Sequence, residues 1–234
     1  MHSETGNTSS PEQQYVPRIL LAGGQCSGKS EMMEELRRHF GTEVLCVPEV
    51  SSLLREYMGI RPNVEDADEI REFQYRLFRI QKECESLADI TAFRRGQRAV
   101  VLDRGTLCGA VYLPGGYEEW GRLCGTTRDR EYRRYDLVLY HEQAGKETYN
   151  QRAEQKEYRP SAFPIAVERA HGLGALWQDH SRFLFIPYSQ DWDEKKKAVI
   201  VAIRTFLREI PLTTQKAVPG SRSSEGALSG SKVG

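Results

Sequence analysis

One segment near the start of the chain constrains its fold more than any other. The apolar run RILLA at 18–22 is followed by the loop GGQCSGKS at 23–30 and by the helix-forming stretch EMMEELRRHF. The loop matches the pattern G-x-x-x-x-G-K-[ST] in full, and that pattern requires a strand before it and a helix after it. The segment therefore predicts a strand, a glycine-rich turn and a helix in direct succession.

Four further apolar runs alternate with helical patterns: EVLCVP, RAVVLD, YDLVLY and RFLFIP, at 43–48, 98–103, 135–140 and 182–187. Parallel strands that are buried on both faces read as continuous apolar stretches, whereas three- and four-residue spacing of apolar side chains indicates helices. Helices are expected at 29–40, 49–58, 66–95, 161–179 and 191–209. The expected fold class is α/β, a P-loop NTPase fold whose parallel five-stranded sheet carries helices on both faces.

Composition sets the expected domain limits. Residues 1–14 are polar and 211–234 are rich in Gly and Ser, so both are expected to be disordered around one P-loop domain at 15–210. The chain has 33 basic and 33 acidic residues, and no global field directs it to nucleic acid. Its five scattered cysteines form no CxxC pair. With neither a signal-like start nor a run of the roughly 20 apolar residues that cross a bilayer, a cytoplasmic location is expected.

The glycine-rich loop indicates nucleoside triphosphate binding. Its glycines let backbone N–H groups turn inward and, with the N-terminus of the next helix, hold the β- and γ-phosphates of ATP or GTP. Lys29 is expected to be catalytic and to reach the β/γ oxygens, and the Ser30 hydroxyl is expected to ligate Mg²⁺. The expected phosphate site consists of Gly23, Gly24, Gln25, Cys26, Ser27, Gly28, Lys29 and Ser30.

Two carboxylates follow predicted strands. Asp103 ends the run VVLD, where it can hold Mg²⁺ through a water or accept a proton from a hydroxyl substrate, although it could also cap a turn. Glu49 follows the second run, at the edge where open α/β sheets bind ligands. Glu49 either orients a substrate hydroxyl or occupies the first turn of a helix, where the helix dipole favours a negative charge.

A polar segment at 143–160 predicts a lid over the triphosphate. Arg159 is expected to be catalytic, and Tyr149 and Arg152 to bind substrate, because guanidinium groups suit phosphoryl oxygens. The alternative is a solvated loop. A second group of basic residues competes for the role: Arg128, Arg130, Arg133 and Arg134.

Four stretches together resemble a known family: GGQCSGKS, VPEVSSLL, VVLDRGTLCGAVYLPGG and YDLVLYHEQAGKETYN. They are similar to the AAA-type P-loop NTPase domain shared by a bacterial nicotinamide riboside kinase and NAD regulator and by an animal translocation-defect protein that binds GTP and phosphoinositides. The likeness spans about 17–209 and is closer to the animal branch.

The resemblance implies a P-loop NTPase fold and nucleotide binding. It places the family's phosphate loop on Gly23, Gly28, Lys29 and Ser30, its aspartate on Asp103, and its lid tyrosine and later arginine on Tyr149 and Arg159. The animal protein continues into a second, triphosphate-tunnel-like domain where this chain has a low-complexity tail. The resemblance therefore gives no support for lipid-headgroup binding by this chain, although such binding stays possible.

Two functions from different classes stay open. The expected one is a Mg²⁺-dependent nucleotide-binding regulator or slow NTPase, which the likeness to the animal branch favours and which needs no acceptor site. The alternative is a nucleoside-type kinase that transfers the γ-phosphate to a hydroxyl, with Asp103 as base and a lid that excludes water. The expected partner is the nucleotide, joined by a small-molecule acceptor or a protein. No nucleic-acid partner is expected, because the tryptophans do not interleave with basic residues.

Overall fold

Five parallel strands form one sheet in the computed structural model, which describes residues 15–154 and 161–210. The predicted terminal segments 1–14 and 211–234 lie outside the described residues. The strands are β1 (Arg18–Gly23), β2 (Val44–Val47), β3 (Ala99–Asp103), β4 (Leu137–His141) and β5 (Phe183–Ile186), in the spatial order β2-β3-β1-β4-β5.

The strand order brings the functional segments to one edge of the sheet. The central strand β1 pairs with β3 on one side and with β4 on the other, with Leu21 opposite Asp103 and Gly23 opposite His141. From β1 the chain runs to β2 at one edge of the sheet and then adds β3 between them. It next crosses to the other side of β1, where it adds β4 and β5, so the direction in which strands are added reverses at β1. In open α/β sheets ligands bind outside the carboxyl ends of the strands at such a reversal.

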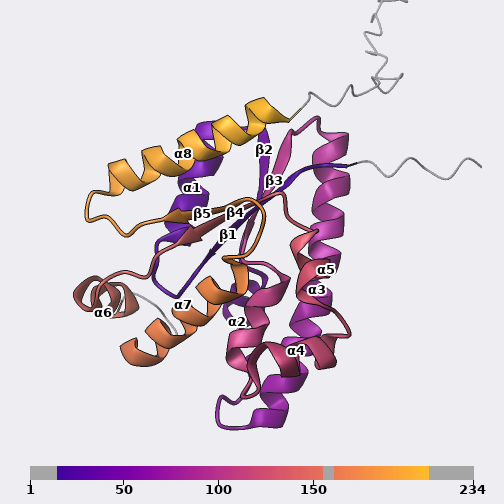
Figure 1. Cartoon of the computed structure of the whole chain (residues 1–234), viewed down its shortest axis with the longest axis vertical. Helices are drawn as coiled ribbons and strands as arrows, with labels where there is room; N and C mark the ends of the chain where they lie inside the picture. Colours follow the sequence, from indigo (N-terminus) through magenta and orange to yellow (C-terminus); the bar gives the residue numbers. More distant parts are fainter. Residues whose placement is uncertain (1–14, 155–160, 211–234) are drawn as a thin grey trace, which may run out of the picture.

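Two layers of helices cover the sheet (Figure 1). One face carries α1 (Lys29–Phe40) and α8 (Trp192–Glu209). The other carries α3 (Ala67–Arg94), the short 3-10 helix η1 (Thr106–Tyr112), α4 (Gly116–Cys124) and α7 (Phe163–Trp177). Three shorter helices lie between these elements in the chain: α2 (Val50–Glu56), α5 (Arg128–Tyr132) and α6 (Lys146–Glu154).

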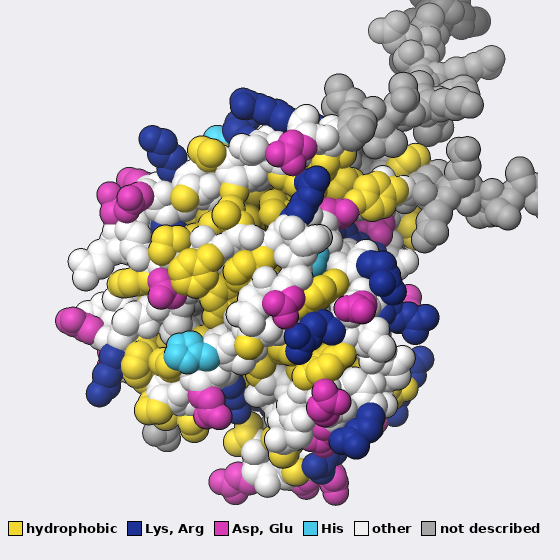
Figure 2. Space-filling model, viewed as in Figure 1, with side chains coloured by type: hydrophobic (Ala, Val, Ile, Leu, Met, Phe, Trp, Pro, Cys, Tyr) yellow, Lys and Arg dark blue, Asp and Glu magenta, His cyan; other side chains and the backbone are white. Residues whose placement is uncertain are grey.

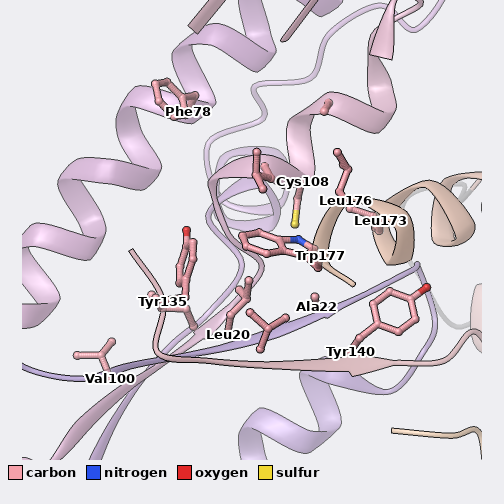
Figure 3. Close-up of a cluster of buried hydrophobic side chains, with 14 of the residues drawn as sticks. Leu20, Ala22, Phe78, Val100, Cys108, Tyr135, Tyr140, Leu173, Leu176 and Trp177 are labelled. Atoms are coloured by element: carbon pink, nitrogen blue, oxygen red, sulfur yellow. The ribbon is translucent and has the colours of Figure 1, made fainter. Parts of the chain in front are cut away.

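Alternate residues of β1 supply both hydrophobic cores. Ile19 and Leu21 pack with residues of α1 and α8, whereas Leu20 and Ala22 pack on the opposite face. Figure 3 shows Leu20 and Ala22 on the side of the sheet occupied by Trp177 of α7. Since β1 is fully buried on both faces, the start of the glycine-rich loop is fixed in space.

The structure confirms the predicted fold class and contains helices that the sequence did not predict. All five strands and the five expected helical segments are present within a few residues of their expected limits. The additional elements are η1, α4, α5 and α6. These are short, and α6 (KETYNQRAE) is polar on nearly every side and shows no apolar spacing. In α4, by contrast, Tyr117, Trp120 and Cys124 recur at three- and four-residue spacing, so a signal for this helix was present in the sequence.

The surface carries mixed charge. Figure 2 shows basic and acidic side chains interspersed around an apolar region on one face of the molecule. Within 15–154 and 161–210, no helix combines the length and the apolar character needed to span a membrane.

Candidate functional site

The glycine-rich loop changes direction through unusual backbone conformations. Gly28 adopts a left-handed conformation, with φ of 87°, immediately before α1, and Gly23 has φ of 137° at the end of β1. A Cβ atom at Gly28 would lie only 3.1 Å from Trp192 and from Arg152. Cys26 also has a positive φ of 56°, which is rare for a residue with a side chain. Strain of this kind persists where the surrounding structure holds it in place.

Side chains from other elements hold three consecutive carbonyl groups of the loop. The donor and acceptor pairs are Gln143 Nε2 to Gln25 O (2.7 Å), Arg152 Nη1 to Cys26 O (3.2 Å) and Lys195 Nζ to Ser27 O (3.0 Å). A peptide whose carbonyl is fixed on one side presents its N–H on the other. The three contacts therefore favour a loop whose N–H groups are available to an anion.

Lys29 lies inside the loop. Its Nζ donates to Gly23 O (3.0 Å), Gly24 O (2.7 Å) and Ser27 Oγ (3.2 Å). Burial lowers the pKa of Lys29, and Arg104 lowers it further, while Asp103 and Glu49 act in the opposite direction. A buried ammonium group that is bound only to neutral oxygens is suited to receive a phosphate.

Lys195 is a functional candidate that the sequence analysis missed. It is buried on α8, and burial, together with Arg152 and Lys29, lowers its pKa to about 8. It belongs to the run DEKKK, which reads as a solvated segment. The spacing of Trp192, Lys195, Val199 and Ile203 nevertheless places it on the inward face of the helix, and this signal was available in the sequence.

We expect Lys195→Met to weaken nucleotide binding by about tenfold, because a charge-assisted hydrogen bond to the loop is lost. Lys197→Met is the matched control, because Lys197 is exposed on the same helix. Calorimetric titration with Mg²⁺–ATP and Mg²⁺–GTP measures both variants. Equal affinities in the two variants would show that Lys195 does not hold the loop.

Asp103 is a buried carboxylate at the end of β3. Burial raises its pKa to about 6; Lys29 opposes this shift and Glu49 adds to it. Its Oδ1 atom is buried without a hydrogen-bond partner among the described residues. Buried polar atoms are normally satisfied, so this oxygen indicates a missing ligand, metal ion or proton donor.

Glu49 and Arg104 form an ion pair beside Asp103. Arg104 has φ of 69°, and its Nε lies 2.9 Å from Glu49 Oε1, while Arg55 Nη2 lies 3.7 Å from the same oxygen. Burial would raise the pKa of Glu49, but Arg104 and Arg55 prevail and lower it to about 2. Glu49 also accepts hydrogen bonds from Ser51 Oγ and Ser52 Oγ. Its carboxylate therefore stays ionised and already has partners.

Two cavities meet at this ion pair. The phosphate cavity, of about 360 Å³, is lined by the loop from Gln25 to Glu31 and by Asp103 and Arg152. The apolar cavity, of about 320 Å³, lies between α2, α3 and η1. Five residues line both cavities: Gln25, Glu49, Arg55, Arg104 and Tyr112. Molecules bound in the two cavities would thus share one wall.

The residues of the phosphate cavity fit a magnesium ion. Ser30 and Asp103 both line it and offer oxygen ligands, the type that Mg²⁺ prefers. No group of three or more His, Cys, Asp or Glu side chains suited to a metal occurs in the described parts of the chain. Phosphate oxygens and water would therefore complete the coordination, as is usual for Mg²⁺ with a nucleotide.

The predicted lid residues have different positions. Arg152 lines the phosphate cavity, as expected for a phosphate ligand, and Arg159 lies outside the described residues. Tyr149 lines neither cavity: it is buried on α6, and its hydroxyl donates to Ser161 O (2.7 Å) and Gln25 Oε1 (3.3 Å). Its described contacts thus join α6 to the loop, whereas the sequence predicted a substrate ligand. Residues 146–154 of the predicted polar lid form the helix α6.

The competing arginine cluster does not line the phosphate cavity. Arg134 pairs with the buried Glu85, and Arg128 lies 3.6 Å from Asp179. Arg134 and Arg128 therefore have carboxylate partners away from the phosphate cavity.

Comparisons with known proteins agree with this architecture. A model of the AAA domain family matches residues 18–195, which is more than half of the chain. No curated protein sequence matches the chain. Among solved structures, the crystal structure of NadR protein in complex with NR is similar, with a TM-score of 0.64 and 16% sequence identity over 83% of this chain and 52% of that chain. This chain thus spans about half the length of the NadR chain.

The likeness to NadR shows a shared fold, and the family match includes the loop, Asp103 and Lys195. These findings confirm the family part of the resemblance seen in the sequence. The resemblance to the animal translocation-defect protein remains a prediction. The chain belongs to the AAA domain family.

Proposed function

We propose that this protein is a kinase that transfers the γ-phosphoryl group of ATP or GTP to the hydroxyl of a small molecule. One observation carries the proposal: the apolar cavity joins the phosphate cavity beside Asp103, at Glu49 and Arg104. A protein that only binds or hydrolyses nucleotide needs no second cavity. A kinase needs one, because the acceptor must be placed in line with the γ-phosphate and shielded from water.

The residues suit a direct transfer. The acceptor oxygen forms a bond to the γ-phosphorus, the bond from that phosphorus to the β–γ bridging oxygen breaks, and the nucleoside diphosphate leaves. Asp103 accepts the proton of the acceptor hydroxyl, and its raised pKa of about 6 suits a base near neutral pH. Lys29 and Arg152 offset the negative charge of the phosphates. Mg²⁺, held by Ser30 and by phosphate oxygens, would neutralise the triphosphate and orient it.

A substitution inside the apolar cavity tests the proposal. Leu77 lines this cavity on α3 and does not line the phosphate cavity. We expect Leu77→Trp to fill the cavity and to reduce phosphate transfer by about 10²-fold, because misplaced reactants lose the advantage of orientation. Nucleotide affinity should be unchanged.

The measurement is transfer of labelled γ-phosphate from ATP and GTP to a panel of hydroxyl compounds, in which NR is included because NadR was crystallised with it. Leu87→Trp is the control, since Leu87 is 64% exposed on the same helix. A wild-type protein that binds nucleotide but phosphorylates no compound of the panel would contradict the proposal.

A nucleotide-binding regulator is the second candidate. Leu53 and Tyr57 line the phosphate cavity, and Tyr57 and the adjacent Met58 are 81% and 65% exposed. Exposed apolar side chains beside a nucleotide site are suited to contact a partner protein. In this case Leu77→Trp would leave nucleotide hydrolysis unchanged, whereas Met58→Ser, at a position that does not line the phosphate cavity, would remove a partner interaction without changing nucleotide affinity.

A further inference from the structure

The charges around the apolar cavity are unbalanced. Four guanidinium groups line it, those of Arg55, Arg61, Arg104 and Arg169. Among the described residues that line it, Glu49 is the one carboxylate. Arg104 and Arg55 both face Glu49, so one carboxylate offsets one of the two positive charges on this side of the cavity.

The other two arginines are not neutralised. No carboxylate in 15–154 or 161–210 lies within ion-pair distance of Arg61 or Arg169. Arg61 comes from the segment between α2 and α3, where its Nε donates to Arg55 O (3.3 Å). Arg169 comes from α7, so the positive charge reaches the cavity from two separate elements.

Arg169 is held in place by neutral groups. Its guanidinium lies 4.8 Å from the centre of the Tyr112 ring, and its Nη1 donates to Ser161 Oγ at 2.6 Å. Tyr112 lines both cavities, which places Arg169 near their junction. Stacking and one hydrogen bond fix the planar group while other N–H donors stay available to a ligand.

The remaining wall is mainly apolar. Phe73, Leu77 and Phe78 of α3 line the cavity together with Val50 of α2, and the amides of Gln74 and Gln81 also line it from α3. A ligand of this cavity would therefore place a largely apolar surface, with room for hydrogen bonds to these amides, against α3. A cationic ligand would meet unneutralised guanidinium groups of its own sign, whereas an anion would pair with them.

We infer that the acceptor carries a carboxylate on an apolar body, and that Arg169 with Arg61 recognises this group. The inference rests on the proposed kinase function and names the chemical class of its acceptor. The acceptor is thus a small hydroxy acid with an apolar body, which presents its hydroxyl toward Asp103 and its acidic group toward Arg169.

Matched alcohols of different charge test this inference. The probes are para-hydroxymethylbenzoate, its neutral amide and the corresponding cationic benzylamine, with a second set built on a branched aliphatic body. Binding is measured by calorimetry on the protein with Mg²⁺–ADP, and transfer is measured separately with Mg²⁺–ATP and Mg²⁺–GTP. We expect the acids to bind at least about tenfold more tightly than their amides, and the amines to bind most weakly of the three.

Variants assign this preference to a residue. Arg169→Gln should remove most of the difference between acid and amide, and Arg169→Lys should restore part of it, because the charge returns without the planar geometry. Arg61→Gln should give a smaller loss, because Arg61 is exposed. Arg208→Gln, an exposed position on α8, is the control and should bind acid and amide as the wild type does.

Two results would overturn the inference. One is equal or tighter binding of the amide or amine by the wild-type protein. The other is a failure of every acid to bind at millimolar concentration. Transfer to a neutral or cationic alcohol, unaffected by Arg169→Gln, would leave the kinase function intact and reject the anionic acceptor. Binding of the acids without transfer to any alcohol would instead reject the kinase function.

Discussion

Asp103→Asn is expected to reduce phosphate transfer by about 10²-fold or more, because asparagine keeps the shape of the side chain but cannot accept the acceptor's proton. Transfer by the wild-type protein should also depend on pH. Since burial raises the pKa of Asp103 to about 6, the carboxylate becomes protonated as the pH falls through this value, and the rate should fall with it. The asparagine variant should lose this dependence. Rates of labelled phosphate transfer between pH values below and above the pKa measure both effects.

Nucleotide affinity provides the control for Asp103. In a kinase the substitution leaves the affinity for Mg²⁺–nucleotide nearly intact, whereas in a regulator Asp103 chiefly tethers Mg²⁺, and Mg²⁺-dependent binding weakens instead. The paired measurement therefore separates the two candidate functions. If both transfer and Mg²⁺-dependent affinity stay at wild-type values, Asp103 has neither role.

Lys29→Ala is expected to weaken nucleotide binding by an order of magnitude or more, because a charge-assisted contact with phosphate is lost. The fold should not be weakened. Burial lowers the pKa of Lys29, which means that the charged form is disfavoured in the folded state, and alanine removes that cost. A thermal-shift titration with ATP and GTP measures both quantities, and a ligand at about 100 times its Kd should add about 2.7 kcal/mol of stability.

Ser30→Ala distinguishes the loss of the lysine from general damage to the loop. This variant removes a candidate Mg²⁺ ligand, so it should weaken binding only when Mg²⁺ is present. Lys29→Ala should weaken binding with and without the metal. Wild-type affinity in Lys29→Ala would show that the loop does not bind phosphate through this residue.

Local patterns were enough to predict the fold and the centre of the site. The apolar runs identified all five strands. The signal is clearest for β1, β3 and β4, which are buried on both faces and leave no polar positions to obscure them, and it holds for β5 even though Leu184 and Phe185 are exposed. The loop pattern located Lys29 and Ser30, and the end of an apolar run located Asp103 beside the loop. Each prediction depended on residues that are adjacent in sequence.

The contacts that were missed join segments far apart in sequence. Arg169 reaches the cavity from α7, and Lys195 reaches the loop from α8, and neither lies near a recognisable motif. Tyr149 lies on α6 within the segment predicted as a lid, and its burial depends on how α6 packs against the loop and Ser161. No local pattern indicates the apolar cavity, because its walls come from α2, α3, η1 and α7 together.

The contact between Lys195 and Ser27 has a consequence for the order in which the protein matures. Residues 23–30 leave the ribosome early, but the helix that holds Ser27 O is the last one described, Trp192–Glu209. The central strand β1 likewise waits for β3 and β4 before both of its edges are paired. A nascent chain that stops before α8 contains the whole loop sequence without its supporting contact. Under the proposed function, nucleotide would therefore stabilise the finished domain more than a chain that stops before α8.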